Sequence, residues 1–437
     1  MTIAPGRPLL RLRLTNTLGG EKHVLVPLQS DAVRMYHCGP TLTEPASIDK
    51  FRSYLLGDVL RRHIEQEGWD VRQVMNLTDV GHLNEYEEDA VEIAASRSGL
   101  YGWELVEKEL TVFHADRRAL NIRDAHFYPR ASDHVAEIIA FIEKLLAAGD
   151  AYRSGGHVYF DITRAKSLGK LSGKSREEML RLQAASARPL APAARAAPIP
   201  HAPAPKRDPL DFDLWRPDPL HQEHWQSPWG RGFPGWHVEC VVMSRKYLGS
   251  CFDIHSGTEE NICPHHECEI AQAEAAAGGP LARIWTHSRP VLLEGKPVSR
   301  RNRNWISVRG LLETGVSGPQ IRCALLSARF RESVELTPEL IDDSRGLIEI
   351  LAACRDRHRG ARKEGNRGGS SISAESMRLR LDAAIGDFRA ALDDDLDTPA
   401  ALRSARKLAE EMNDARVSPA PQVAELIDRF DRVLGIL

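Results

Sequence analysis

The first 80 residues alternate between strand-like and helix-like segments, and this alternation restricts the fold more than any other feature of the sequence. Apolar VLVP at residues 24–27, the segment around MYHC and VRQVMNLTDV at residues 71–80 each have the pattern of a strand. Between the last two, residues 53–67 have a helical pattern. Strands that alternate with helices predict a parallel α/β sheet, which binds ligands at the carboxyl ends of its strands. We expect Cys38 at such an end.

The chain is long enough for two or three domains, and its composition indicates where they connect. It has 437 residues, of which 42% are hydrophobic, so a sizeable core can form. Residues 184–205 are rich in Ala and Pro, and residues 359–373 are basic and rich in Gly, as is typical of linkers. The sequence predicts an α/β domain over residues 1–330 with an inserted helical segment at about 85–180. A helical bundle is expected over residues 331–437.

Charge, cysteine content and the amino terminus together favour a protein of the reducing cytoplasm. The net charge of -3 gives no overall attraction to nucleic acid, although local patches can still bind it. Seven cysteines are an odd number and indicate no disulfide framework. The amino terminus MTIAPGRPLLRLRL lacks the apolar stretch of a signal peptide, and no run approaches the length of a membrane span. We therefore expect a cytoplasmic monomer without a membrane partner.

Four residues with the chemistry of zinc ligands are spread over more than half of the chain. They are Cys38, Cys240, His265 and Glu269. The last two are four positions apart, so on a helix they would close on one ion. Zinc takes about four ligands, and a site with replaceable coordination accepts the sulfur of a substrate. The same residue types also occur without a metal, and Cys263 or Cys268 can instead join the ion and close a purely structural site. We expect His266 to support the ligands rather than to bind the ion.

Eight segments in order along the chain carry a resemblance to one family. They are LRLTNTLGGEKHVLVPL, MYHCGPT, MNLTDVGHL, PRASDHVAEIIAFIEKLLAAGDAY, RDPLDFDLW, SPWGRGFPGWHVEC, FDIHSG and CPHHECEIAQAE. From about Leu10 to Leu437 the chain resembles the cysteinyl-tRNA synthetases, which are class I aminoacyl-tRNA synthetases. The resemblance implies a Rossmann-type catalytic domain and a zinc ion, held by the four residues above, that binds L-cysteine through its sulfur. It also implies a substrate pocket formed by Gly39, Thr41, Ser53, Asn76, Leu77, Thr78 and Trp236. Without the resemblance, Trp236 would be interpreted as a core aromatic residue.

The nucleotide motifs of that family are altered in this sequence. The resemblance aligns the HIGH motif with Ser47-Ile48-Asp49-Lys50 and the KMSKS motif with PVSRR at residues 297–301. Residues 256–260 read SGTEE, where the family has consecutive glycines followed by Asp. Asp49 would place a negative charge beside the phosphates of ATP, which with Mg²⁺ is the implied cosubstrate. The nucleotide-binding candidates are Ser47, Lys50, Gly257, Thr258 and Glu260, and the catalytic candidates for phosphate contact are Lys296, Ser299 and Arg300.

Three functions agree with these observations. The first is a cysteinyl-tRNA synthetase-like ligase that forms cysteinyl adenylate and charges tRNA, with an activity impaired by the altered ATP motifs. The second is a ligase that joins cysteine to a small amine or a carrier protein. It is favoured because the chain also resembles the cysteine ligase of mycothiol biosynthesis and ends at VLGIL, where full-length synthetases usually continue into an anticodon-binding region. The third is a non-catalytic paralogue that binds cysteine or zinc. We favour the first.

Overall fold

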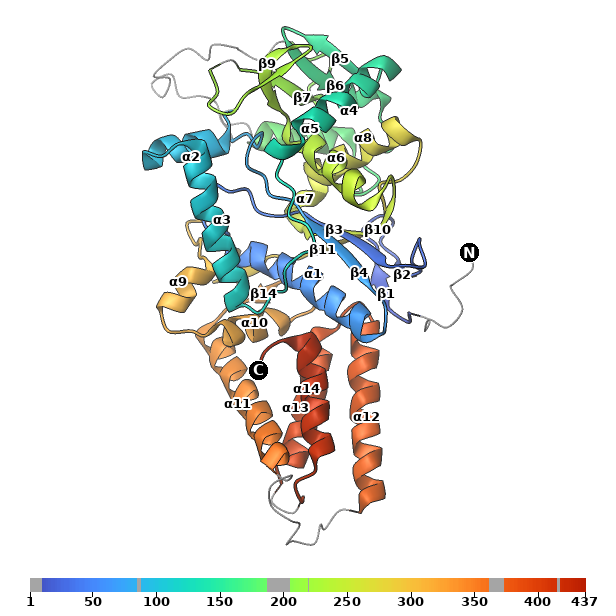
Figure 1. Cartoon of the computed structure of the whole chain (residues 1–437), viewed down its shortest axis with the longest axis vertical. Coiled ribbons are helices and arrows are strands. Elements are labelled where there is room, and N and C mark those ends of the chain that lie inside the picture. The colour runs from blue at the N-terminus through green and yellow to red at the C-terminus, as the bar shows by residue number, and fades with distance from the viewer. Residues whose placement is uncertain (1–9, 85–87, 187–204, 219, 361–372, 415–416) are drawn as a thin grey trace.

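A four-stranded parallel sheet lies at the centre of the computed structural model, which describes residues 10–84, 88–186, 205–218, 220–360, 373–414 and 417–437 (Figure 1). Its strand order is β11-β10-β3-β4, and each neighbouring pair is parallel. The strands are β3 (Val33–His37), β4 (Val71–Met75), β10 (Phe252–Thr258) and β11 (Ala282–Ser288). This confirms the predicted α/β class. Most of both predicted linkers, 184–205 and 359–373, lies outside the described residues.

Helix α1 (Ile48–Gln66) connects β3 to β4 and is largely buried against the sheet. It begins five residues before the predicted residue 53, because the Ser47 hydroxyl accepts a hydrogen bond from the Lys50 N–H and caps it. The strand predicted over residues 24–27 is wrong except for its first residue. Only Val24 is in a strand, β2 (Lys22–Val24), which pairs with β1 (Arg13–Thr15) outside the central sheet.

Most of the chain between β4 and β10 forms a separate layer above the central sheet (Figure 1). Its second sheet is antiparallel, in the order β5-β6-β7-β9-β8, so the predicted insertion at 85–180 contains strands as well as helices. The domain boundaries themselves stay a prediction. The elements are α2 (Ala90–Ser98), α3 (Gly102–Ala119), α4 (Val135–Ala148), β5 (Ala151–Ser154), β6 (His157–Phe160), α5 (Arg176–Ser186), β7 (Phe212–Pro217), β8 (Trp225–Ser227), β9 (Gly230–Pro234) and α6 (Trp236–Leu248).

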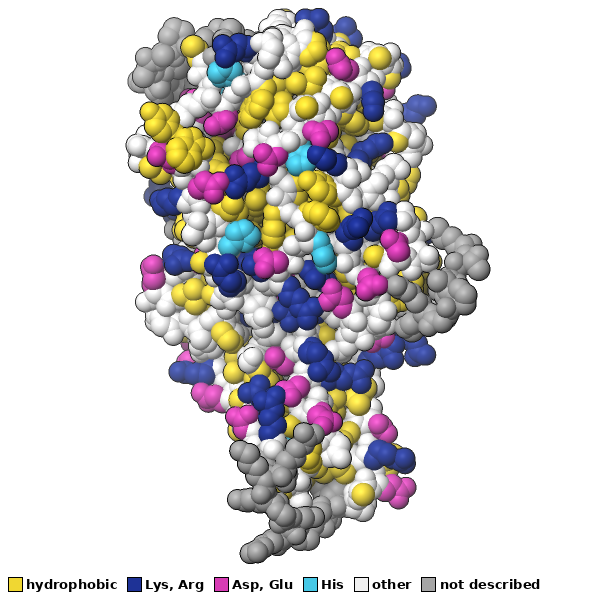
Figure 2. Space-filling view, in the orientation of Figure 1, with side chains coloured by type: hydrophobic (Ala, Val, Ile, Leu, Met, Phe, Trp, Pro, Cys, Tyr) yellow, Lys and Arg dark blue, Asp and Glu magenta, His cyan; other side chains and the backbone are white. Residues whose placement is uncertain are grey.

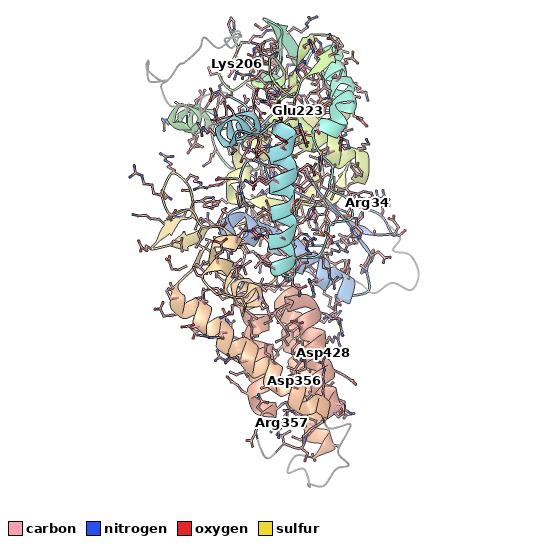
Figure 3. The ribbon with its side chains drawn as sticks, turned by 60° about the vertical axis from the view of Figure 1, so that its left-hand side comes forward. Arg34, Lys206, Glu223, Asp356, Arg357 and Asp428 are labelled. Atoms are coloured by element: carbon pink, nitrogen blue, oxygen red, sulfur yellow. The ribbon has the colours of Figure 1, made fainter. Side chains whose placement is uncertain are left out.

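The carboxyl-terminal part is helical, as predicted, and continues below the central sheet in Figures 1 and 3. A small sheet of β12, β13 and β14 links it to the α/β part, because β14 lies beyond residue 330 and still pairs with β12. Figure 3 marks Asp356, Arg357 and Asp428 in this bundle. The remaining elements are α7 (Glu259–Asn261), α8 (Glu267–Ala277), β12 (Val291–Leu293), β13 (Lys296–Pro297), α9 (Val308–Glu313), α10 (Gly318–Leu326), β14 (Val334–Glu335), α11 (Pro338–Gly360), α12 (Ala374–Asp393), α13 (Thr398–Met412) and α14 (Pro421–Leu434).

The surface carries both signs of charge. Figure 2 shows acidic and basic side chains interleaved over the visible face, in agreement with the small net charge. Among the described residues, no helix combines the length and the apolar character that a membrane crossing requires. The cytoplasmic location and the monomeric state stay predictions.

Candidate functional site

A pocket of about 370 Å³ opens where the strands of the central sheet end. Cys38 directly follows β3, Asn76 directly follows β4 and Thr258 is the last residue of β10, so three neighbouring strands deliver side chains to one place. The predicted site residues that line the pocket are Cys38, Gly39, Thr41, Ser47, Lys50, Ser53, Asn76, Thr78, Trp236, Thr258, Glu260, His265 and Ser299.

A buried group of side chains that could hold a metal ion lies next to this pocket, and Cys38 and His265 of the group also line it. Ligand atoms of Cys38, His265, His266 and Glu269 are within 4.8 Å of one another. Cys240 joins the group through side-chain contacts with both Cys38 and His265. The four predicted side chains therefore lie close together, and their role as metal ligands stays a prediction. His266, which we expected to support the ligands, also belongs to the group, since its Nε2 atom lies 3.2 Å from Cys38 Sγ. Cys263 and Cys268 are not in the group.

The geometry and charge of this group fit a shared cation. The His265 Nε2 and Glu269 Oε1 atoms are 2.9 Å apart, yet Glu269 Oε1 has no hydrogen-bond partner among the described residues. Burial raises the pKa of Glu269, but the His255 and His265 rings outweigh it and bring the pKa to about 2, so the carboxylate is ionised. Burial also raises the pKa of Cys38, and contact with Cys38 raises that of Cys240. Both thiols would need a cation nearby to ionise.

Trp236 closes the pocket beside this group. Its ring stacks on those of both His82 and His265, with 4.1 Å between the ring centroids in each pair. The Thr41 hydroxyl is 2.8 Å from His82 Nδ1 and so helps to hold the His82 ring in place. His82 was missed from the sequence, although it lies in the quoted MNLTDVGHL segment. His82, Trp236 and His265 all line the pocket.

The loop after β3 is held close to the loop after β4. The Gly39 N–H donates to Asn76 Oδ1 at 2.9 Å, and the Asn76 amide donates to the Thr78 hydroxyl at 3.1 Å. A side chain at position 39 is excluded, because a Cβ atom there would lie 1.8 Å from the Asn76 carbonyl oxygen. Leu77 contributes its side chain to a small hydrophobic cluster instead of the pocket wall.

Two of the remaining charged candidates, Lys50 and Arg300, are paired with acidic side chains. The Lys50 ammonium lies 3.3 Å from Glu260 Oε2 and 3.4 Å from the Thr258 hydroxyl. Arg300 lies outside the pocket lining, where it stacks 3.7 Å over the Trp305 ring and pairs with Glu44. Lys296 is exposed on β13, and Gly257 packs behind the lining against Asn261 and His266. Of the KMSKS-aligned candidates, only Ser299 lines the pocket.

Asp49 is anchored to the fold as well as lining the pocket. Its Oδ1 atom accepts a hydrogen bond of 2.7 Å from the N–H of Val291, the first residue of β12. The side chain is nearly buried, and burial raises its pKa. The residue that replaces the glycine of the family motif therefore connects α1 to β12.

Replacing Asp49 with glycine is expected to lower the free energy of unfolding by about 1–3 kcal/mol, because the buried Val291 N–H loses its acceptor. Urea denaturation measures the change. Asp49→Asn keeps an acceptor oxygen and serves as the matched control, with a smaller loss. Equal losses in the two variants would show that the hydrogen bond contributes little.

The comparisons with known proteins extend over nearly the whole chain. The model of the class I (C) tRNA synthetase catalytic domain matches residues 24–346. A cysteine–tRNA ligase of Symbiobacterium thermophilum is 35% identical over 433 residues, covering 98% of this chain and 87% of that protein. One of Thermus thermophilus is 38% identical over 396 residues, covering 90% of this chain and 78% of that protein.

Solved structures support the fold independently of sequence. Mycobacterium tuberculosis methionyl-tRNA synthetase, in complex with methionyl-adenylate, has a TM-score of 0.61 at 14% identity and covers 93% of this chain and 90% of its own. A leucyl-tRNA synthetase of Agrobacterium radiobacter has a TM-score of 0.63 at 11% identity, covering 94% and 84%. At such identities these likenesses show the fold alone, which is that of the class I synthetases. The family match over residues 24–346 and the relatives at 35% identity or more show that the chain belongs to the class I cysteinyl-tRNA synthetase family.

Proposed function

We propose that the protein binds L-cysteine through a zinc ion and activates it with ATP for transfer to tRNA. The convergence of two thiols, an imidazole and a carboxylate beside one pocket, which Cys38 and His265 line, supports this most strongly. Cys38, Cys240, His265 and Glu269 would hold the ion, since these are donor types that zinc takes in proteins. Bound zinc supplies a soft Lewis acid that prefers a thiolate to a hydroxyl, which favours cysteine over serine.

The other pocket residues would orient the amino acid and the nucleotide. Trp236 bounds the space beside His265, and the Asn76 amide fixes the backbone at Gly39. The cysteine carboxylate would attack the α-phosphate of ATP, with pyrophosphate as the leaving group and Mg²⁺ accompanying the nucleotide. Lys50 and Ser299 are predicted site residues inside the pocket that can donate to phosphate oxygens. The adenylate would then pass its cysteinyl group to the tRNA.

A second candidate is cysteine binding with little or no ATP activation. The contacts of the altered motifs favour it. Lys50 is paired with Glu260 and Arg300 with Glu44, so each glutamate would compete with the phosphates of ATP for its basic partner. Glu44, Asp49 and Glu260 also line the pocket, where their charge would oppose a triphosphate. Losing one preorganised charge-stabilising group typically costs about a hundredfold in rate or more.

Cysteine-dependent exchange of pyrophosphate into ATP on zinc-loaded protein tests the proposal. We expect exchange in the wild type and a loss of more than about a hundredfold in Cys240→Ala, because a thiol of the zinc set is removed. Cys354→Ala, which changes a buried cysteine of the helical bundle, is the matched control and should retain exchange.

The other outcomes separate the alternatives. Absence of exchange together with retained cysteine binding would contradict activation and favour the second candidate. Exchange without charging of a tRNA(Cys) transcript would contradict the tRNA step and favour a small amine or carrier protein as acceptor.

A further inference from the structure

Three side chains form a hydrogen-bonded row beneath the pocket. The His37 Nε2 atom lies 3.1 Å from the Ser53 hydroxyl of α1, and His37 Nδ1 lies 2.6 Å from the Ser256 hydroxyl of β10. All three residues are at most 1% exposed. Of the three, only Ser53 lines the pocket.

The fold builds this row specifically. His37 and Ser256 are register partners on the paired strands β3 and β10, so their side chains share one face of the sheet. Ser53 and Gly57 lie one turn apart on the overlying face of α1. A Cβ atom at Gly57 would lie 3.3 Å from His37 Nδ1, so the glycine leaves room for the ring. Ser256 stands where the family resemblance implies a glycine, which has no hydroxyl to offer.

We assign the direction of each proton from the carbonyl oxygen that faces Ser256. The Ser256 hydroxyl donates to the Tyr36 carbonyl oxygen at 3.4 Å, which leaves its oxygen to accept from the Nδ1–H of His37. A buried imidazole whose two nitrogens face hydroxyls is most stable in its neutral form. Its Nε2 atom then carries the lone pair, and the Ser53 hydroxyl donates to it.

We propose that His37 and Ser256 are positioning residues that fix Ser53 as a hydrogen-bond acceptor toward the pocket, where it binds an N–H or O–H group of the ligand. With its proton turned inward, Ser53 offers only oxygen lone pairs and disfavours a carboxylate or phosphate at that point. The inference rests on the proposed function for the identity of the ligand. The donor is the ammonium group of cysteine or a ribose hydroxyl of ATP.

The tautomer of His37 is the first test and needs neither substrate. Nitrogen-15 NMR of histidine-labelled, zinc-loaded protein reports which ring nitrogen carries the proton, and His37→Gln identifies the signal by its loss. We expect a proton on Nδ1 and none on Nε2. A proton on Nε2, or on both nitrogens, would overturn the proposal whatever the protein binds.

Ser53→Ala then identifies the ligand group. Affinities of the zinc-loaded protein are measured for cysteine against 3-mercaptopropionate, which lacks the amine, and for ATP against its 2′-deoxy and 3′-deoxy analogues. In one pair, the substitution should lower the affinity for the ligand that carries the donor by about tenfold and leave the affinity for its analogue unchanged. Equal effects on both members of every pair, or no effect at all, would contradict an acceptor role.

A matched pair of substitutions at His37 tests the positioning role. His37→Gln places an amide oxygen near the position of Nε2 and should keep the selectivity between the two members of the pair. The side chain in His37→Asn reaches only to the position of Nδ1, so this variant should lose that selectivity. Thermal unfolding of both variants checks that they are equally folded. Equal selectivity in the two would contradict the role of His37. A wild type that binds neither cysteine nor ATP would overturn the proposed function instead, and the tautomer would still decide the arrangement of the row.

Discussion

Replacing Asp58 with alanine is expected to destabilise the protein by about 3–5 kcal/mol, because it leaves two buried guanidinium groups without their carboxylate. Asp58 Oδ2 lies 2.6 Å from Arg322 and 2.8 Å from Arg62, and all three side chains are at most 5% exposed. Arg62 also donates to the carbonyl of Arg432, and Arg322 to that of Leu434. The cluster therefore joins α1 and α10 to the last helix, α14.

Chemical denaturation measures this loss, and Asp428→Ala is the matched control. Asp428, marked in Figure 3, forms an exposed pair with Arg359 on the same helical bundle. Removing that pair should cost under about 1 kcal/mol, since solvent screens it. Similar losses in the two variants would contradict the structural importance of the buried cluster.

The same cluster predicts how stability depends on pH. Burial raises the pKa of Asp58, but Arg322 and Arg62 outweigh it and hold the folded-state pKa below the ordinary value of 3.8. A lowered folded-state pKa contributes stability above the unfolded-state pKa and loses it as the pH falls through the folded-state value. The stability difference between wild type and Asp58→Ala should therefore shrink below about pH 4.

Cys240→Ala is expected to weaken zinc binding by more than about a hundredfold, because changes in residues that merely support metal ligands already cost 10- to 100-fold. Competition with a chelator and counting of bound zinc measure the effect. Cys268→Ala is the matched control, since Cys268 is a buried cysteine of α8 outside the ligand group. Loss of zinc in Cys268→Ala would instead support the closed structural site. Retention of zinc in Cys240→Ala would point to His266 as the fourth ligand.

Sequence reasoning succeeded for features that depend on neighbours along the chain. The strand–helix–strand order of β3, α1 and β4 follows from local periodicity, and so does the position of Cys38 at a strand end. The spacing of His265 and Glu269 also predicted that they approach each other, and their side chains lie 2.9 Å apart. The family resemblance supplied the remaining candidates, because no local pattern connects residues 38, 240 and 265.

Contacts between distant segments depended on tertiary structure. His266 meets Cys38 across 228 positions, Asp49 meets Val291 across 242 and Arg300 meets Glu44 across 256. The row of Ser53, His37 and Ser256 exists because β3 and β10 pair in one register and α1 lies over them. The sequence by itself determined the class of fold and the kinds of chemical groups near the pocket. Only tertiary structure decided which of those groups face one another, because strand register and helix packing are set by the whole core and not by any one segment.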